Sequence, residues 1–213
     1  MTNVLILGAH GQIARLATTQ LIAQPDVQLK LFLRRAARLA NVENGAAEII
    51  EGDAANSADL TRALSNVDVV YANLAGANIE AQAANVVHAM DQVGVKRLIW
   101  VSTLGIYDEV PGAFGQWNHQ MLDDGYLPTY AAAAKVIEES NLEYTIIRPA
   151  WLDNKDEVDY ETTQKGEPFK GTEVSRKSVA TYIVHLINHP HEQIGRSIGV
   201  NKPNTDGDKP AWY

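Results

Sequence analysis

The sequence predicts an α/β protein, with a three-layer, doubly wound parallel sheet in one domain that spans residues 1–213. Two observations carry this prediction. Short apolar runs alternate with amphipathic helical patterns through the first two thirds of the chain, as strands alternate with crossover helices in a parallel sheet. The first run, Val4–Leu7, leads directly into a turn that contains Gly8 and Gly11 and opens a helix. A chain of 213 residues is long enough to bury one sizeable core.

Short apolar runs predict the strands. In chain order, we expect strands at Val4–Leu7, Leu29–Leu33, Ala47–Ile50, Val67–Ala72, Arg97–Ser102, Tyr144–Arg148 and Ser197–Val200. Amphipathic patterns predict the helices between them. In chain order, we expect helices at Gln12–Ala23, Ser57–Leu64, Asn78–Val93, Thr129–Ser140 and Ser178–Asn188. Pro25 ends the first helix and Gly94 ends the third. Asn56 or Ser57 caps the second helix.

Two segments interrupt this alternation. Gly105–Pro128 reads as a long irregular loop, and Trp151–Ser175 reads as a polar segment with a turn at Lys165–Pro168. Both follow the carboxyl ends of predicted strands, where ligands bind in open α/β sheets. We therefore expect both segments to serve function, and residues 151–213 to form a small extension that supplies substrate-side loops, the last helix and the last strand.

Composition excludes several classes of protein and site. The chain has no cysteine, so it forms no disulfide and no thiolate metal site. No apolar run reaches the length of a membrane span, and the chain starts directly with a strand pattern, so we expect no signal peptide and a cytoplasmic protein. A net charge of −8 argues against nucleic acid or an anionic membrane as the main partner. We expect a small-molecule substrate, with monomer and dimer both open.

The glycine turn after the first strand predicts a dinucleotide site. Its spacing is Gly-x-x-Gly-x-x-Ala, and it lies where a dinucleotide-binding fold places its phosphate turn. Glycine lets the backbone approach the pyrophosphate, and the helix N-terminus supplies free N–H groups and a partial positive charge. The expected pyrophosphate contacts are Gly8, His10, Gly11, Gln12 and Ile13.

Arginines at the end of the second strand predict the type of cofactor. An acidic residue there suits a free ribose 2′-hydroxyl, whereas arginine suits a 2′-phosphate. The strand runs into Arg34 and Arg35, with Arg38 one turn later, and no acid lies between Leu29 and Ala40. Because guanidinium groups bind phosphate in a bidentate fashion, we expect NADP(H) rather than NAD(H).

Residues that follow the third and fourth strands are expected along the same cofactor. Asp53 is a candidate acceptor for the adenine amino group, beside Ala54, although an aspartate here also suits a plain turn. The fourth strand ends in Asn73, Leu74, Ala75 and Gly76, whose small members permit close approach. The predicted cofactor site is completed by Ser102, Lys135, Pro149, Ala150 and Trp151.

Several short motifs, in order along nearly the whole chain, resemble a known family. They are Gly8–Ala14, Glu51–Asp53, Gly94–Arg97 leading to Val101–Thr103, Tyr144–Pro149 and Val174–Arg176. The chain resembles the atypical short-chain dehydrogenase/reductases, in the small NAD(P)H-binding, NmrA-like and biliverdin-reductase-B-like group. The resemblance implies an NAD(P)-binding Rossmann fold but names no substrate, because the group includes reductases, isomerases and proteins that bind cofactor without known turnover.

The catalytic pair of short-chain dehydrogenases is out of register here. In that family a Tyr-x-x-x-Lys pair on one helix face carries proton transfer, and a serine or threonine after the fifth strand polarises the substrate oxygen. Lys135 matches the family lysine, but Tyr130 precedes it by five residues instead of four. Five residues rotate a regular helix by about 500°, so the two side chains would lie about 140° apart. Ser102 and Thr103 are the candidate hydroxyls.

Three sources for the reaction proton stay open. Tyr130 reaches the site if the helix start is irregular, or another group among Tyr107, His119 and Tyr126 supplies the proton. The third source is solvent, with direct hydride transfer, as the resemblance to the biliverdin-reductase-B group implies. The candidate substrate contacts are Tyr107, Trp117, His119 and Trp151. We expect no metal site.

The predicted activity is NADP(H)-dependent hydride transfer to a small planar or carbonyl acceptor: a quinone, a flavin, an aldehyde or a ketone. One alternative is a redox-sensing or regulatory module that binds NAD(P)H without turnover, which the register of Tyr130 favours. The aromatic residues after the fifth strand favour an enzyme instead. A second alternative is a sugar-nucleotide-type epimerase or dehydratase, which needs a working Tyr-x-x-x-Lys pair and usually a larger carboxyl-terminal domain.

Overall fold

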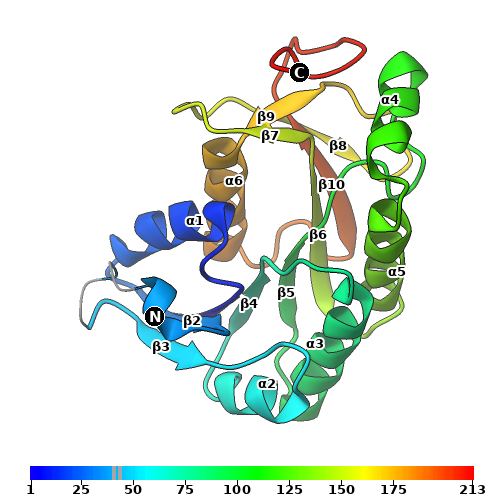
Figure 1. Cartoon of the computed structure of the whole chain (residues 1–213). Helices are drawn as coiled ribbons and strands as arrows, with labels where there is room; N and C mark the ends of the chain where they lie inside the picture. Colours follow the sequence, from blue (N-terminus) through cyan, green and yellow to red (C-terminus); the bar gives the residue numbers. More distant parts are fainter. Residues whose placement is uncertain (40–41, 43–44) are drawn as a thin grey trace.

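An eight-stranded sheet forms the middle layer of the protein, a computed structural model that describes residues 1–39, 42 and 45–213 (Figure 1). From edge to edge the strand order is β3-β2-β1-β4-β5-β6-β10-β8. Their bounds are β1 Thr2–Leu7, β2 Val27–Leu33, β3 Glu48–Glu51, β4 Val69–Ala72, β5 Arg97–Val101, β6 Glu143–Pro149, β8 Glu161–Gln164 and β10 Arg196–Asn201. Every neighbouring pair is parallel except β10 and β8.

Helices cover both faces of the sheet, as apolar parallel strands require. One face carries α1 (Gln12–Ile22) and α6 (Arg176–Asn188), which contribute buried residues to one apolar cluster. The other face carries α2 (Ser57–Ala63), α3 (Ile79–Val93) and α5 (Tyr126–Glu138), which contribute to a second cluster. The predicted three-layer, doubly wound α/β fold is confirmed, with one antiparallel edge strand added.

Predicted local signals begin α2 and end α3. Asn56, not Ser57, caps α2, because its side-chain oxygen accepts a hydrogen bond from the Ala58 N–H at 2.9 Å. Gly94 follows α3 in the left-handed conformation, with φ of 80°. In the described ranges, none of the helices combines the length and the apolar character needed to cross a bilayer.

The strand order creates a crevice beside β1. The chain runs from β1 outward to β2 and β3, then returns to the other side of β1 as β4. The crossover helices therefore leave in opposite directions on the two sides of β1, and a gap opens at the carboxyl ends of β1 and β4. In doubly wound sheets, this switch point is where ligands bind.

The predicted loop Gly105–Pro128 is wrong over most of its length. It contains α4 (Gly112–Leu122), and α5 begins at Tyr126, three residues before the predicted start. Two glycines in α4 lower its intrinsic helix propensity. One of them, Gly115, is required by packing, because a Cβ there would lie 2.0 Å from the Val110 carbonyl oxygen. Tertiary packing thus overrides a weak local signal.

The segment Trp151–Ser175 is also more regular than the sequence predicted. It forms β7 (Trp151–Asp153) and β9 (Glu173–Ser175), which pair in a small parallel sheet, and the edge strand β8. The predicted turn at Lys165–Pro168 is present, closed by the Glu167 N–H and the Gln164 carbonyl at 3.2 Å. The strands of this segment have three or four residues and are mostly polar, so they are too short to show an alternation of apolar and polar residues.

Candidate functional site

A hollow of about 420 Å³ lies at the switch point and is the candidate binding site. The carboxyl ends of β1, β2, β3 and β4 all contribute to its wall. Predicted cofactor residues that line it are Gly8, His10, Gly11, Arg34, Arg35, Arg38, Asp53, Ala54, Asn73, Leu74, Ala75 and Gly76. The remaining lining residues, which were not predicted as cofactor contacts, are Phe32, Leu33, Gly52, Asn78 and Gln82.

The glycine turn fits a phosphate because no side chain can occupy it. Gly8 has φ of 72°, and a Cβ there would lie 2.3 Å from the Asn73 carbonyl oxygen. A Cβ on Gly11 would lie 1.9 Å from the Asn73 side-chain nitrogen. Gly11 is the N-cap of α1 and offers no side chain to the first N–H groups of that helix, which are left for a ligand. Gln12, the first residue of α1, is exposed, whereas Ile13 is buried in the core.

Three exposed arginines form the basic end of the hollow. Arg34 and Arg35 follow β2, and Arg38 lies in the short 3-10 turn Ala36–Leu39. This turn is held by Glu51 at the end of β3, whose carboxylate accepts a hydrogen bond from the Ala36 N–H at 2.8 Å. None of the three guanidinium groups pairs with a carboxylate of the described residues.

Polar groups after β3 and β4 shape the middle of the hollow. One oxygen of Asp53 accepts a hydrogen bond from the Ala55 N–H at 2.9 Å, so Asp53 serves the turn and also lines the hollow. Gln82 of α3 donates to the Ala75 carbonyl at 3.2 Å and to the Asn78 side chain at 2.8 Å. Gln82 therefore fixes the loop after β4, a role that no local sequence signal announces.

The next strand along the sheet brings a buried hydroxyl to the same edge. Ser102 and Thr103 follow β5, and each is 7% exposed. The Ser102 N–H donates to the Ile147 carbonyl at 2.7 Å, and the Leu104 N–H donates to the Pro149 carbonyl at 3.2 Å. The segment after β5 thus lies against Pro149 at the end of β6. Among the described residues, the Ser102 hydroxyl has no hydrogen-bond partner, although it is buried.

The structure separates the two residues of the expected catalytic pair. Tyr130 is 4% exposed and its ring stacks on Tyr126, with 4.2 Å between centroids. Burial, the larger cause, and the neighbouring Tyr126 raise the pKa of Tyr130, opposed by the Gly76 backbone. Lys135 lies on the outer face of α5, where its side chain is 73% exposed and pairs with Glu139 at 3.8 Å. Its predicted ribose contact stays a prediction that this placement does not favour.

Two of the four predicted substrate residues are engaged elsewhere. The Tyr107 hydroxyl donates to Glu138 at 2.7 Å, and the Lys165 ammonium lies 4.1 Å above its ring. Burial is the main cause that raises the pKa of Tyr107. His119 of α4 lies between two carboxylates, with Asp123 at 2.8 Å and Asp108 at 3.3 Å. Through its contacts with Glu138 and Lys165, Tyr107 holds the loop after β5 in place.

The other two predicted substrate residues belong to an aromatic cluster. The Trp117 and Trp151 rings lie 4.7 Å apart, and the Trp151 N–H donates to the Asn118 side chain at 2.9 Å. Tyr213 lies 4.9 Å from Trp117, and Trp212 lies 6.4 Å from Trp151. Trp151 follows Pro149 and Ala150 at the end of β6, so this cluster stands beyond the carboxyl edge of the sheet.

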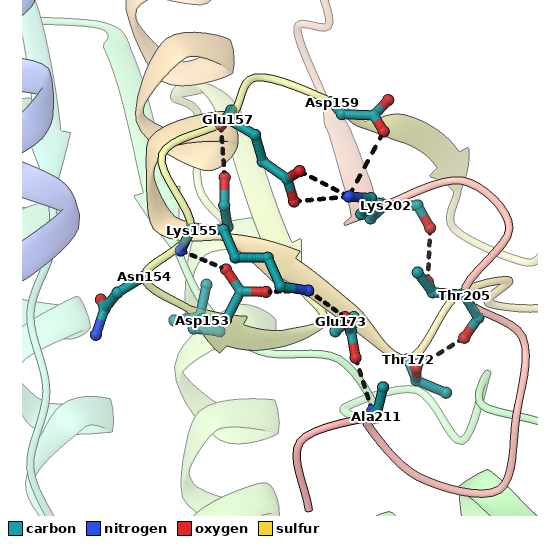
Figure 2. Close-up of polar contacts among 12 residues, drawn as sticks. Asp153, Asn154, Lys155, Glu157, Asp159, Thr172, Glu173, Lys202, Thr205 and Ala211 are labelled. Atoms are coloured by element: carbon teal, nitrogen blue, oxygen red, sulfur yellow. Dashed lines mark hydrogen bonds and ion pairs between the residues drawn. The ribbon is translucent and has the colours of Figure 1, made fainter.

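A polar network anchors the last residues to the small sheet (Figure 2). The buried Glu173 carboxylate accepts hydrogen bonds from the Ala211 N–H at 2.7 Å and from the Lys155 ammonium at 2.8 Å. Nearby, Lys202 pairs with Glu157 at 2.7 Å. Sequence reasoning missed the contribution of Trp212 and Tyr213 because the anchor, Glu173, is 38 residues away from Ala211.

The NAD(P)H-binding family matches residues 8–190, most of the chain and all of the hollow's wall. The chain belongs to this family. An NAD(P)H-binding protein fits the glycine turn, the arginine end and the strand order described above. The predicted resemblance to small NAD(P)H-binding short-chain dehydrogenase/reductases is confirmed.

Relatives of this NAD(P)H-binding protein cover its whole length. A Rossmann-fold NAD(P)-binding family protein of Shigella flexneri is 46% identical, covers 99% of this chain and 98% of its own, and has a TM-score of 0.86. A short-chain dehydrogenase/reductase of Veillonella parvula, solved in complex with NADP, is 33% identical, covers 99% of each chain, and has a TM-score of 0.92. An uncharacterised sugar epimerase of Bacillus subtilis is 25% identical, and the match covers 98% of this chain and 96% of the relative.

Proposed function

We propose that this protein is an NADP(H)-dependent reductase that transfers hydride to a small planar or carbonyl acceptor, such as a quinone, a flavin, an aldehyde or a ketone. The observation that carries the proposal is the basic end of the hollow, where Arg34, Arg35 and Arg38 follow β2. Among the described residues that line the hollow, the one acidic residue is Asp53, which follows β3. A 2′-phosphate is the group that this end recognises best. The Veillonella parvula relative was solved with NADP, which supports this choice.

Each part of the site has a separate task in this proposal. The glycine turn and the free N–H groups of α1 bind the pyrophosphate, and the arginines bind the 2′-phosphate. Ser102, whose hydroxyl has no partner within the described part of the chain, offers that hydroxyl to the nicotinamide or to the acceptor oxygen. When bound, NADPH supplies the hydride. The cluster of Trp117 and Trp151 excludes water from the side beyond β6.

Solvent is the proton source that the geometry favours. Proton transfer by a side chain at neutral pH is most efficient when the pKa of that group lies near the working pH. Burial moves the pKa of Tyr130 the other way, and Lys135 points to solvent instead of toward the Tyr130 hydroxyl. A quinone or a flavin can take its proton from water after hydride transfer, so such an acceptor needs no protein acid.

The double variant Arg34→Ala/Arg35→Ala tests the cofactor preference. We expect its Kd for NADPH to rise on the order of 100-fold, because two charge-assisted hydrogen bonds to phosphate are lost. Its Kd for NADH should change by less than about threefold, since NADH carries no 2′-phosphate. Titration of nucleotide fluorescence measures both constants. Arg196→Ala, which removes an exposed arginine at the start of β10, is the matched control. Equal losses for both nucleotides would contradict the proposal.

Tyr130→Phe tests the proton source. We expect the kcat of NADPH oxidation with a quinone to stay within about threefold of the wild-type value, since loss of a general acid costs on the order of 100-fold or more. A panel of quinones, flavins and small aldehydes, assayed by NADPH absorbance, supplies the measurement. A hundredfold loss would assign the acid role to Tyr130 and refute the solvent route.

A regulatory module that binds NADP(H) without turnover is the second candidate, favoured by the separation of Tyr130 from Lys135. In the same panel, this module would bind NADPH tightly and oxidise none with any acceptor. The Bacillus subtilis relative is named a sugar epimerase, but that reaction needs the Tyr–Lys pair that is apart here. The epimerase alternative is therefore the weakest of the three.

A further inference from the structure

Two histidines and one glutamate converge at the end of α6, remote from the hollow. His185 lies in the last turn of the helix, His189 is its C-cap, and Glu192 follows in the turn that leads into β10. One potential ligand atom from each side chain lies within 4.8 Å of the others. The two imidazole rings are 4.2 Å apart, and the His185 Nε2 atom is 2.8 Å from a Glu192 carboxylate oxygen.

The His189 ring is held in the tautomer that a metal ion needs. Its Nδ1 atom lies 2.8 Å from the His185 carbonyl oxygen. A carbonyl oxygen only accepts hydrogen bonds, so Nδ1 carries the hydrogen, and in the neutral ring the Nε2 lone pair is left available. Metal-binding histidines are commonly oriented this way, with the second ring nitrogen donating to a backbone carbonyl.

The turn that carries Glu192 is fixed by the sheet. The Glu192 carbonyl accepts a hydrogen bond from the guanidinium of Arg97, which is 4% exposed, at 3.0 Å. The Gln193 carbonyl accepts from the Thr145 hydroxyl at 2.8 Å. The Gly195 N–H donates to the Tyr144 carbonyl at 2.8 Å. The carboxylate and the two imidazoles therefore project from elements that are already in place, which lowers the cost of assembling a site.

We infer that His185, His189 and Glu192 form a binding site for one divalent transition-metal ion of the zinc type. Two imidazole nitrogens and a carboxylate oxygen suit Zn²⁺ better than Ca²⁺ or Mg²⁺, which prefer oxygen ligands. Two ligand atoms about 2.1 Å from a tetrahedral ion are about 3.4 Å apart, so the His185 and Glu192 ligand atoms must separate slightly. The two imidazole planes are 26° apart and stacked, so the His185 ring must also rotate until its Nε2 lone pair points at the ion that His189 binds. Water completes the coordination.

The bound ion would link the end of α6 to the turn before β10. It would raise the free energy of unfolding and leave the affinity for NADPH unchanged. The sequence predicts no metal site, because the late histidines have no carboxylate triad nearby and suit the surface of a fraying helix end. The structure adds Glu192, which folds back from beyond Pro190 to reach His185.

Calorimetric titration of chelator-treated protein with Zn²⁺ tests the inference. We expect one site per chain with a Kd in the micromolar range or tighter, and His189→Ala and Glu192→Gln should each weaken it at least tenfold. His191→Ala is the matched control, since it removes an exposed histidine of the same turn that lies outside the site, and it should bind as the wild type does. Both site variants change exposed side chains, so they are expected to fold.

A second readout is the melting temperature. At a free Zn²⁺ concentration of about 100 times Kd, the folding equilibrium shifts about 100-fold toward the native state, and the melting temperature rises by several degrees. No saturable binding by the wild type, or equal binding by His189→Ala and the wild type, would overturn the inference. NADPH affinity is measured in parallel without Zn²⁺, so the metal site and the proposed reductase can fail separately.

Discussion

Replacing Arg148 with Met is expected to lower the free energy of unfolding by about 3–5 kcal/mol, the usual cost of breaking a buried ion pair. The Arg148 side chain is fully buried on β6 and pairs with Glu109, whose side chain is 4% exposed. Without the guanidinium, the hydrogen-bond donors that the Glu109 carboxylate keeps among the described residues are the Gly105 and Tyr107 N–H groups, each at 3.0 Å. Urea denaturation followed by circular dichroism measures the loss.

The exposed pair of Lys96 and Asp91 supplies the control for this variant. Its atoms are 3.0 Å apart, and the side chains are 44% and 60% exposed. Lys96→Met should therefore cost less than about 1 kcal/mol. The double variant Glu109→Gln/Arg148→Met should lose less stability than the two single variants lose together. The reason is that each single variant leaves the other member of the pair buried without its partner. A loss below about 1 kcal/mol for Arg148→Met would show that the pair contributes little.

Replacing Gly8 with Ala is expected to reduce NADPH affinity by about 100-fold or more, which corresponds to about 2.7 kcal/mol. The added Cβ would lie 2.3 Å from the Asn73 carbonyl oxygen, so the ends of β1 and β4 must separate. Alanine at φ of 72° also costs about 1 kcal/mol in backbone strain. Nucleotide fluorescence titration measures the affinity.

Gly94→Ala is the control that separates the cost of backbone strain from the effect of moving the ends of β1 and β4 apart. Gly94 has φ of 80°, but a Cβ there meets no atom within 4 Å. It should lose a similar amount of stability to strain and keep wild-type affinity for NADPH. If Gly8→Ala also kept wild-type affinity, the glycine turn would have to be removed from the proposed pyrophosphate site.

The sequence predicted the parts of this molecule that depend on short-range pattern. Apolar runs predicted central strands such as β4 and β5 because these strands are buried on both faces and read as continuous apolar segments. The turn at Gly8 and the arginines after β2 were found because the topology places these positions at one edge of the sheet. The strand order itself follows from the doubly wound class and not from any residue.

What the sequence did not predict depends on contacts between distant residues. α4 forms against its weak propensity because Gly115 packs on the Val110 backbone. β8 is short and polar and gains its place only by pairing with β10. Gln82 becomes part of the site through two hydrogen bonds to the loop after β4. The five-residue step between Tyr130 and Lys135 was visible in the sequence, and its consequence, two side chains facing different ways, appears in the structure.

The aromatic cluster gives the protein an optical reporter of its own. Of the four tryptophans in the chain, Trp117, Trp151 and Trp212 lie in this cluster, whereas Trp100 is fully buried in the sheet. Emission from the exposed part of the cluster is sensitive to polarity and to a neighbouring ring, so it follows the contact between the segment at Ala211 and the end of β6. Tryptophan fluorescence can therefore report ligand binding or chain movement beyond the carboxyl edge of the sheet. This measurement needs no added label and no knowledge of the acceptor.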